Sequence, residues 1–225
     1  DVVAVNPGNE SRGADQLADS QSPQDDRRAP LLVVSLVLLV CMVIAVLLRA
    51  VVDQPDPTSL REMGFLLLPD AVEVRPFALT DQRGAAFGPE QLEGNWTLLF
   101  FGFASCPDVC PTTLAKLKKA VDGLDVAPRV ALVTVDPARD TEALLGSYVE
   151  AFDPAFLGLR GSALELEAFA EQFHVNFTLV PGADGKYLME HTAHIVVLDP
   201  QARHVGFFMT PHEPERMREA LLAVL

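Results

Sequence analysis

The chain has 225 residues, a formal net charge of −14 and a hydrophobic content of 49%. This length allows one domain with appendages. The acidic balance argues against a protein that binds the phosphate backbone of nucleic acids, because such binding needs clustered Lys and Arg. Three cysteines are too few for a fold that is held together by disulfide bonds.

The N-terminal region predicts a tail followed by a membrane anchor. Residues 1–29 are rich in Asp, Ser, Gln, Gly and Pro, which predicts a disordered acidic tail. Residues 30–52 are predicted to form a single transmembrane helix, since the 22 residues from Leu31 to Val52 would span about 33 Å as a helix and the hydrocarbon core of a bilayer is about 30 Å thick. A cleaved signal peptide normally has a shorter apolar region of about 7–15 residues.

Basic residues on the two sides of this apolar stretch predict its orientation. Arg27 and Arg28 precede it, whereas Arg49 stands alone near its end. This bias favours an N-terminus inside the cell. We therefore expect the protein in the inner (cytoplasmic) membrane, with its C-terminal domain in the periplasm or an equivalent exported space.

The rest of the chain reads as a linker, residues 53–72, and one domain, residues 73–225. Within the domain, periodicity and turn residues predict alternating strands and helices. In chain order we expect a strand at 73–80, a strand at 96–103, a helix at 107–121, a strand at 129–136, a helix at 140–151, a strand at 156–161, a helix after a capping box at 162–165, two strands within 192–209 and a helix from 214 onward. This order predicts an α/β fold, a thioredoxin-like domain with an N-terminal β extension.

Two cysteines, Cys106 and Cys110, follow the apolar run in "FFGFASCPDVCPTT". They fall at the carboxyl end of a predicted strand, where open α/β sheets form their sites. A helix that starts near Pro107 would place both sulfurs at its N-terminus, which favours thiolate over thiol. The four-residue spacing permits a disulfide, because helical residues four apart lie about 6 Å apart, but it is not the usual redox spacing of thioredoxin-like proteins. A redox pair, a metal site and a purely structural pair all remain open at this point.

A metal site would need further ligands, and the five histidines are the candidates. Two thiolates with one imidazole suit copper, whereas zinc normally takes four ligands. His191 stands out because it follows the polar stretch "PGADGKYLME" and opens a predicted buried strand. His194 is expected on the same strand, His174 at a helix end, and His204 and His212 at the surface.

The segments "FFGFASCPDVCPTTL", "VTVDPARDT", "AFDPAFLGLRGS" and "EHTAHIVVLDP" together resemble the Sco/SenC family of membrane-anchored copper proteins. The resemblance implies that Cys106, Cys110 and His191 bind one copper ion, as Cu(I) or Cu(II). It also implies a role in assembling the dinuclear copper centre of cytochrome c oxidase, with the copper-bearing oxidase subunit and a copper donor protein as partners. Here Glu190 and Thr192 flank the histidine, where the family usually has Asp and Ser. Residues 136 and 140 in "VDPARD" are expected to form a turn and a helix cap.

These observations lead to three hypotheses of different classes. The first is a metallochaperone for the oxidase copper centre rather than a turnover enzyme. The second is a thiol–disulfide oxidoreductase that keeps the cysteines of that centre reduced, with Cys106 and Cys110 as its catalytic redox pair. The third is an accessory subunit of a respiratory membrane complex. A peroxidase is disfavoured, because no Thr stands a few residues ahead of Cys106.

Overall fold

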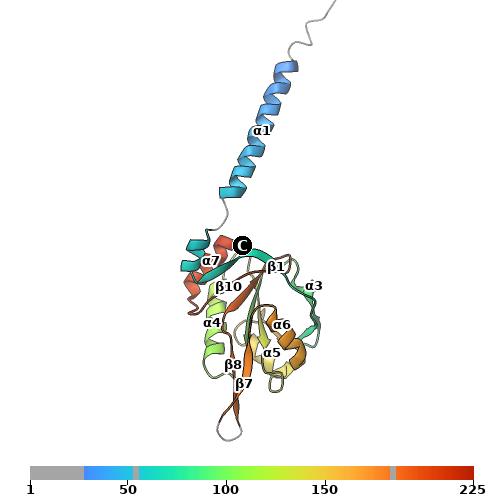
Figure 1. The fold of residues 1–225 in the computed structure, drawn as a ribbon, viewed down its shortest axis with the longest axis vertical. Helices are drawn as coiled ribbons and strands as arrows, with labels where there is room; N and C mark the ends of the chain where they lie inside the picture. Colours follow the sequence, from blue (N-terminus) through green and yellow to red (C-terminus); the bar gives the residue numbers. More distant parts are fainter. Residues whose placement is uncertain (1–27, 53–55, 183–185) are drawn as a thin grey trace, which may run out of the picture. The chain divides into compact units, whose positions relative to one another are not determined.

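The computed structural model describes residues 28–52, 56–182 and 186–225 (Figure 1). The chain divides into two units, Asp1–Gln54 and Pro55–Leu225. In the first unit, helix α1 (Arg28–Val52) coincides with the helix predicted at 30–52, and the side chains of residues 31–46 are exposed. Within the described part of the chain, no helix combines the length and the apolar character that crossing a membrane requires. The tail predicted for residues 1–29 lies outside the described residues as far as residue 27.

The second unit is built around strand β4, the predicted strand with the continuous apolar run, and all six of its residues are buried. This strand, Thr97–Gly102, pairs in parallel with β5 (Arg129–Thr134) on one side and antiparallel with β9 (Ile195–Leu198) on the other. In order across the sheet, the eight strands are β1 (Phe65–Glu73), β10 (Arg203–Phe208), β9 (Ile195–Leu198), β4 (Thr97–Gly102), β5 (Arg129–Thr134), β6 (Leu157–Arg160), β2 (Leu79–Asp81) and β3 (Ala86–Phe87). The parallel strands β4, β5 and β6 with a closing antiparallel β9–β10 pair confirm the predicted α/β plan.

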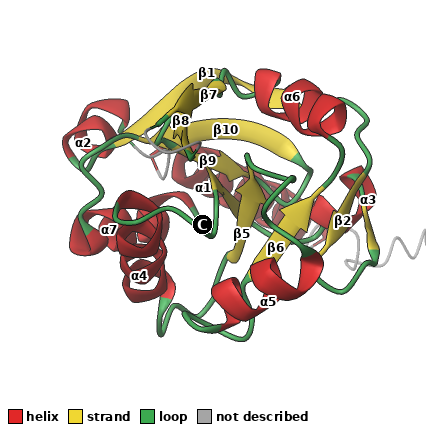
Figure 2. Ribbon diagram, turned by 90° about the horizontal axis from the view of Figure 1, so that it is seen from below, coloured by secondary structure: helices red, strands yellow, loops and turns green. Residues whose placement is uncertain are grey.

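Helices cover both faces of this sheet (Figure 2). Within its described residues, the helices of the second unit are α2 (Pro57–Glu62), α3 (Pro89–Leu92), α4 (Val109–Val121), α5 (Glu142–Glu150), α6 (Ala163–Glu171) and α7 (Pro214–Val224). Successive residues of β4 point to opposite faces. A Cβ on Gly102 would point at the Cys110 sulfur of α4, whereas the ring of the preceding Phe101 packs against Phe169 of α6. Helices α4 and α6 therefore lie on opposite faces of the sheet.

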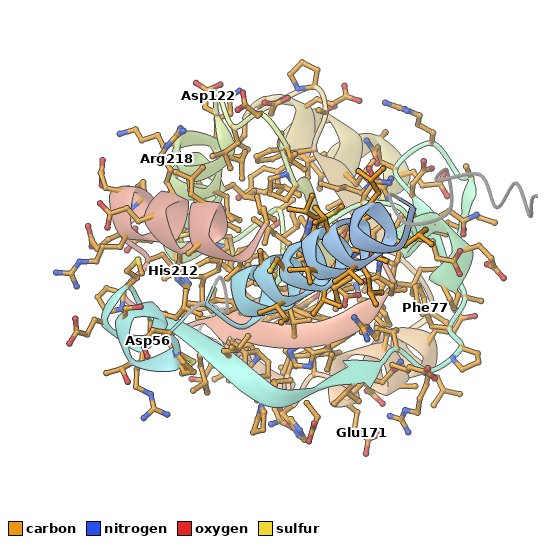
Figure 3. The ribbon with its side chains drawn as sticks, turned by 90° about the horizontal axis from the view of Figure 1, so that it is seen from above. Asp56, Phe77, Asp122, Glu171, His212 and Arg218 are labelled. Atoms are coloured by element: carbon orange, nitrogen blue, oxygen red, sulfur yellow. The ribbon has the colours of Figure 1, made fainter. Side chains whose placement is uncertain are left out.

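Helix α7 packs beside α4 and closes the face that carries the cysteines. Its Arg218 donates to the backbone carbonyls of Lys119 and Asp122 at the C-terminal end of α4 (Figure 3). These carbonyls have no partner within their own helix, and a guanidinium satisfies them well. The C-terminal helix thus fixes the far end of α4, whose near end holds the site.

The linker predicted at residues 53–72 is wrong over most of its length. Asp56 caps α2 by accepting from the backbone N–H groups of Thr58 and Ser59, and Leu60 in this helix is fully buried. Strand β1 then pairs with β10 at one edge of the sheet. The strand predicted at 73–80 is also wrong as one element, since β1 ends at Glu73 and β2 starts at Leu79 on the opposite side of the sheet.

A second sheet consists of the hairpin β7 (Phe177–Pro181) and β8 (Tyr187–His191). It is antiparallel, with Phe177 opposite His191. The hairpin extends from the second unit beyond its main sheet (Figure 1). His191 therefore ends a hairpin strand, and the expectation that it opens a buried strand is wrong.

Candidate metal centre

The cysteine segment connects β4 to α4, and its two cysteines have different surroundings. Helix α4 begins at Val109, two residues later than predicted, so Cys106 lies before the helix and Cys110 in its first turn. The backbone N–H of Cys110 donates to the Cys106 sulfur at 3.4 Å. Both thiols are free; Cys106 is partly exposed and Cys110 is fully buried. The structure thus provides one accessible and one enclosed sulfur.

The buried thiol behaves opposite to the expectation that both cysteines favour the thiolate. Burial raises the pKa of Cys110, since a charged sulfur would lose its hydration, and a hydrogen bond that the neutral Cys110 thiol donates to the Cys106 sulfur adds to the effect. The space around this sulfur is tight: a Cβ on Gly102 would lie 3.0 Å from it. Deprotonation of Cys110 therefore requires a cation or a reaction partner beside the sulfur.

His191 faces this buried sulfur from the hairpin. Its Nε2 lies 3.7 Å from Cys110 Sγ, although the two residues are 81 positions apart. Its Nδ1 lies 3.0 Å from the carbonyl oxygen of Thr192, which can only accept, so Nδ1 carries the proton. Burial lowers the pKa of His191 and keeps the ring neutral. The remaining lone pair, on Nε2, is then directed toward the sulfur, which is the arrangement of a metal-ligating imidazole.

Two aromatic rings of the β4 region hold the imidazole in place. Phe100 and Phe103 contact the His191 ring edge-on, with centroids at 6.0 and 6.2 Å. Both phenylalanines are buried. They therefore present apolar surface to the imidazole.

The other histidines are directed elsewhere. The Nε2 atoms of His194, His204 and His212 contact the backbone oxygens of Phe173, Gly206 and Ala193, respectively. The surface positions expected for His204 and His212 are wrong, because these residues are only 4% and 5% exposed. His194 precedes β9 rather than sharing a strand with His191. His174 is exposed and has a positive φ of 55°.

The side chains of Cys106, Cys110 and His191 do not form a three-ligand group in the structure. In the described ranges of the chain, no group of three or more His, Cys, Asp or Glu side chains is arranged to hold a metal ion. The structure brings together Cys110 and His191, and it places the Cys106 sulfur against the backbone N–H of Cys110.

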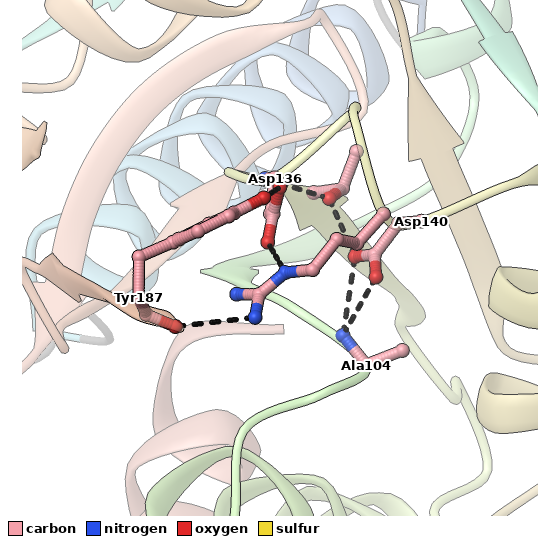
Figure 4. Close-up of polar contacts among 6 residues, drawn as sticks. Ala104, Asp136, Asp140 and Tyr187 are labelled. Atoms are coloured by element: carbon pink, nitrogen blue, oxygen red, sulfur yellow. Dashed lines mark hydrogen bonds and ion pairs between the residues drawn. The ribbon is translucent and has the colours of Figure 1, made fainter. Parts of the chain in front are cut away.

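A polar cluster next to the centre was not predicted from the sequence. Asp136 and Asp140 are both buried, and the helix cap expected at 140 is instead supplied by Thr141. Asp140 accepts from the hydroxyl of Thr134 at 2.6 Å and from the backbone N–H of Ala104, two residues before Cys106 (Figure 4). Burial raises the pKa of Asp140. The paired acids of "VDPARD" were the available signal, but their contacts link segments that are far apart in the sequence.

Comparison with known proteins agrees with this architecture. The family model described as SCO1/SenC matches residues 68–225. The SCO2-like protein of Rickettsia felis is 34% identical over 152 residues, which cover 64% of this chain and 73% of the relative. The structure resembles copper-bound ScoI of Arabidopsis thaliana, with a TM-score of 0.63 and 32% identity over 66% of this chain and 94% of that one. Copper-bound ScoI of Bradyrhizobium japonicum gives 0.62 and 38% over 68% of this chain and 100% of that one. These matches confirm the predicted thioredoxin-like fold, and the chain belongs to the SCO1/SenC family.

Proposed function

We propose that this protein binds one copper ion through Cys106, Cys110 and His191 and delivers it during assembly of the dinuclear copper centre of cytochrome c oxidase. The observation that carries this proposal is the lone pair of His191 Nε2 facing the buried Cys110 sulfur at 3.7 Å. Similar proteins from two organisms have copper bound in their structures, which supports the choice of metal.

The donor set favours Cu(I). Two thiolates and one imidazole form a soft, three-coordinate shell. Copper binding would displace the proton of Cys110, because a cation beside the sulfur offsets the cost of burying its charge. Cys106 has to turn toward the other two ligands as the metal enters. Since it is partly exposed, it is also the ligand that thiolates of an acceptor can replace first.

The test is metal analysis of the purified full chain, reduced and then loaded with Cu(I). We expect one equivalent of copper in the parent and a clear loss in Cys106→Ser, Cys110→Ser and His191→Ala. His174→Asn is the matched control. His174 is exposed, and none of its contacts in the described residues involves a cysteine. Asn tolerates the positive φ at this position. Equal copper affinity in His191→Ala and the parent would refute the ligand assignment.

Thiol–disulfide exchange is the second candidate, favoured by the free thiols with one accessible member. The Cys106 thiolate would attack a partner disulfide, forming a mixed disulfide and releasing one partner thiolate. Cys110 would then attack the Cys106 sulfur, lose its proton, release the second partner thiol and leave a Cys106–Cys110 disulfide. Reduction of an oxidase-subunit disulfide by the metal-free parent and by His191→Ala at equal rates would favour this role. Stoichiometric recovery with a purified respiratory complex would instead favour an accessory subunit.

Membrane anchorage through residues 30–52 remains part of the proposal. Its support is the uncharged sequence of residues 31–48 and the exposure of the apolar side chains at 31–46 along α1. Such a surface needs a lipid or protein cover. We expect the full chain to stay in the membrane pellet after alkaline extraction, with the second unit open to protease from the exported side. Release of the full chain into the supernatant would exclude an integral anchor.

A further inference from the structure

The position of His191 depends on how the β7–β8 hairpin is attached to the rest of the protein. Among the described residues, this hairpin forms a sheet of its own and shares no strand pairing with the eight-stranded sheet. The backbone bond at its base, from Thr192 N–H to the carbonyl of Asn176, joins the two sides of the hairpin to each other. Apart from the chain connections at its two ends, side-chain contacts therefore hold the hairpin, and with it His191, against the rest of the domain.

In the described residues, Arg139 contacts the hairpin through both a stacking interaction and a hydrogen bond. Its guanidinium lies 3.9 Å from the ring centroid of Tyr187 in β8, and its Nη1 donates to the Tyr187 carbonyl at 3.2 Å (Figure 4). On the other side, Arg139 Nε donates to Asp136, and the Tyr187 hydroxyl donates to the same carboxylate at 2.9 Å. The guanidinium is thus fixed between a carboxylate of the β5–α5 loop and a tyrosine of the hairpin.

This contact lies next to the metal ligand. Tyr187 and His191 are four residues apart on one strand, so their side chains point to the same face of the hairpin. The Arg139 guanidinium also lies 5.6 Å from the ring of Phe103, the residue whose edge contacts His191. Arg139 therefore touches one neighbour of His191 on the hairpin and another on the cysteine segment.

The same loop also holds the cysteine segment. Asp140, the residue after Arg139, accepts from the backbone N–H of Ala104. Two consecutive residues of this loop are thus fastened to the two parts of the chain that supply the ligands. Burial of charged groups in this loop costs free energy of folding. The Asp136 side chain is 3% exposed, and Arg139 Nη2 is buried without a partner in the described part of the chain. A partly buried charge pair of this kind is a poor source of stability, whereas the planar guanidinium, with Nε on Asp136 and Nη1 on the Tyr187 carbonyl, fixes direction well.

We propose that Arg139 is a positioning residue of the metal centre, which clamps Tyr187 against Asp136 and so holds His191 Nε2 opposite Cys110 Sγ. The inference rests on the proposed copper site, but its structural part does not. Without the guanidinium, the hairpin keeps its own pairing, the Tyr187–Asp136 hydrogen bond and its packing on the core, but it loses the contact that fixes Tyr187 beside Phe103. The imidazole then samples positions away from the sulfur, and the fold of the main sheet is retained.

The first experiment uses the metal-free full chain and does not depend on copper. Nuclear Overhauser contacts between the His191 imidazole and the Phe103 ring are measured in the parent, Arg139→Met and Arg160→Met. Arg160→Met is the matched control, because Arg160 pairs with Glu142 and contacts the Pro137 carbonyl of the same loop without touching the hairpin. We expect these contacts to disappear in Arg139→Met and to persist in Arg160→Met. Their persistence in Arg139→Met would overturn the proposal.

The second experiment measures Cu(I) affinity by competition with a chelator. Loss of a partner that orients a ligand typically lowers metal affinity about 10- to 100-fold, and we expect this for Arg139→Met in the parent background. In a His191→Ala background, the same substitution should change affinity less than 2-fold, because its effect passes through the imidazole. An equal loss in both backgrounds would overturn the proposal. An unchanged affinity in His191→Ala alone would refute the copper ligand set, while the metal-free measurement still decides the role of Arg139.

A second variant covers the case in which Arg139→Met does not fold. Tyr187→Leu removes the ring and hydroxyl from the hairpin side, outside the main sheet, and leaves the Asp136–Arg139 pair intact. We expect it to reproduce both the loss of the His191–Phe103 contact and the loss of affinity. Tyr187→Phe, which retains the ring beneath the guanidinium, should restore most of both. Parent-like behaviour of Tyr187→Leu in both measurements would contradict the clamp.

Discussion

His204 should make the stability of the protein depend on pH between pH 6.5 and about 4. This side chain is 4% exposed and lies edge-on between the rings of Phe173 and Phe207, at 5.3 and 4.4 Å. Burial lowers its pKa from 6.5 to about 4, and the positive charge that His194 and His174 can carry adds to the effect. Between pH 6.5 and about 4, His204 is therefore protonated in the unfolded chain and neutral in the folded protein.

The sign and size of the effect follow from linkage. Above pH 6.5 the imidazole is neutral in both states and has no effect. As the pH falls from 6.5 to about 4, the unfolded chain binds the proton and the folded chain does not, so the free energy of unfolding decreases. Since one pKa unit corresponds to 1.36 kcal/mol, the total loss is about 3 kcal/mol, complete below about pH 4.

The assay is urea denaturation of the parent and His204→Gln at pH 7, 5.5 and 4.5. Glutamine can still donate to the Gly206 carbonyl, which the His204 ring contacts at 3.2 Å, but it does not titrate. The remaining histidines and carboxylates titrate in both proteins, so they cancel in the difference. We expect the parent to lose about 2–3 kcal/mol more than the variant by pH 4.5. The same pH dependence in both proteins would refute the reasoning, whatever the stability of the variant at pH 7.

Three further outcomes test the packing of the site and of the domain. Gly102→Ala places a Cβ 3.0 Å from the Cys110 sulfur, so we expect a loss of about 1–3 kcal/mol in urea denaturation and weaker Cu(I) binding; parent-like values would show that α4 can move away at no cost. Iodoacetamide should modify the partly exposed Cys106 before the buried Cys110, as read by mass spectrometry of peptides, and the reverse order would contradict the burial of Cys110. Ser162→Ala removes an oxygen that accepts from the backbone N–H of Glu165 and should cost about 1 kcal/mol while copper binding stays unchanged; a change in copper binding would show coupling between α6 and the site.

The elements that the sequence predicts correctly are those whose pattern lies within the element itself. The run at 96–103 is apolar at nearly every position because β4 is covered on both faces, and Ser162 with Glu165 forms the predicted capping box. The β7–β8 hairpin lacks such a signal. Among the residues that the structure describes, its strands pair only with each other, and Leu179 and Leu188 are about half exposed, so neither a buried run nor a clean alternation appears.

Strand β1 was missed for a different reason. Residues 65–68 are apolar enough for a strand, but they follow a segment with prolines and acids that is typical of linkers. What makes them a strand is the pairing with β10, which lies about 140 positions later in the chain. Local propensity has no access to a partner at that distance, and β formation depends strongly on such context.

The cysteine pair shows how far spacing alone can describe a site. The sequence predicts that Cys106 and Cys110 both lie at one helix N-terminus and both favour the thiolate. Because α4 starts only at Val109, Cys106 lies outside the helix, and its sulfur accepts a hydrogen bond from the backbone N–H of Cys110. The sulfur of Cys110 instead packs against Gly102. The two thiols can therefore play different roles in either of the two proposed functions. The exposed one can meet a partner first, and the buried one becomes a thiolate only when a cation or a forming disulfide replaces its proton. In the proposed copper site, His191 supplies the lone pair opposite this buried sulfur and so allows a metal ion to take the place of that proton.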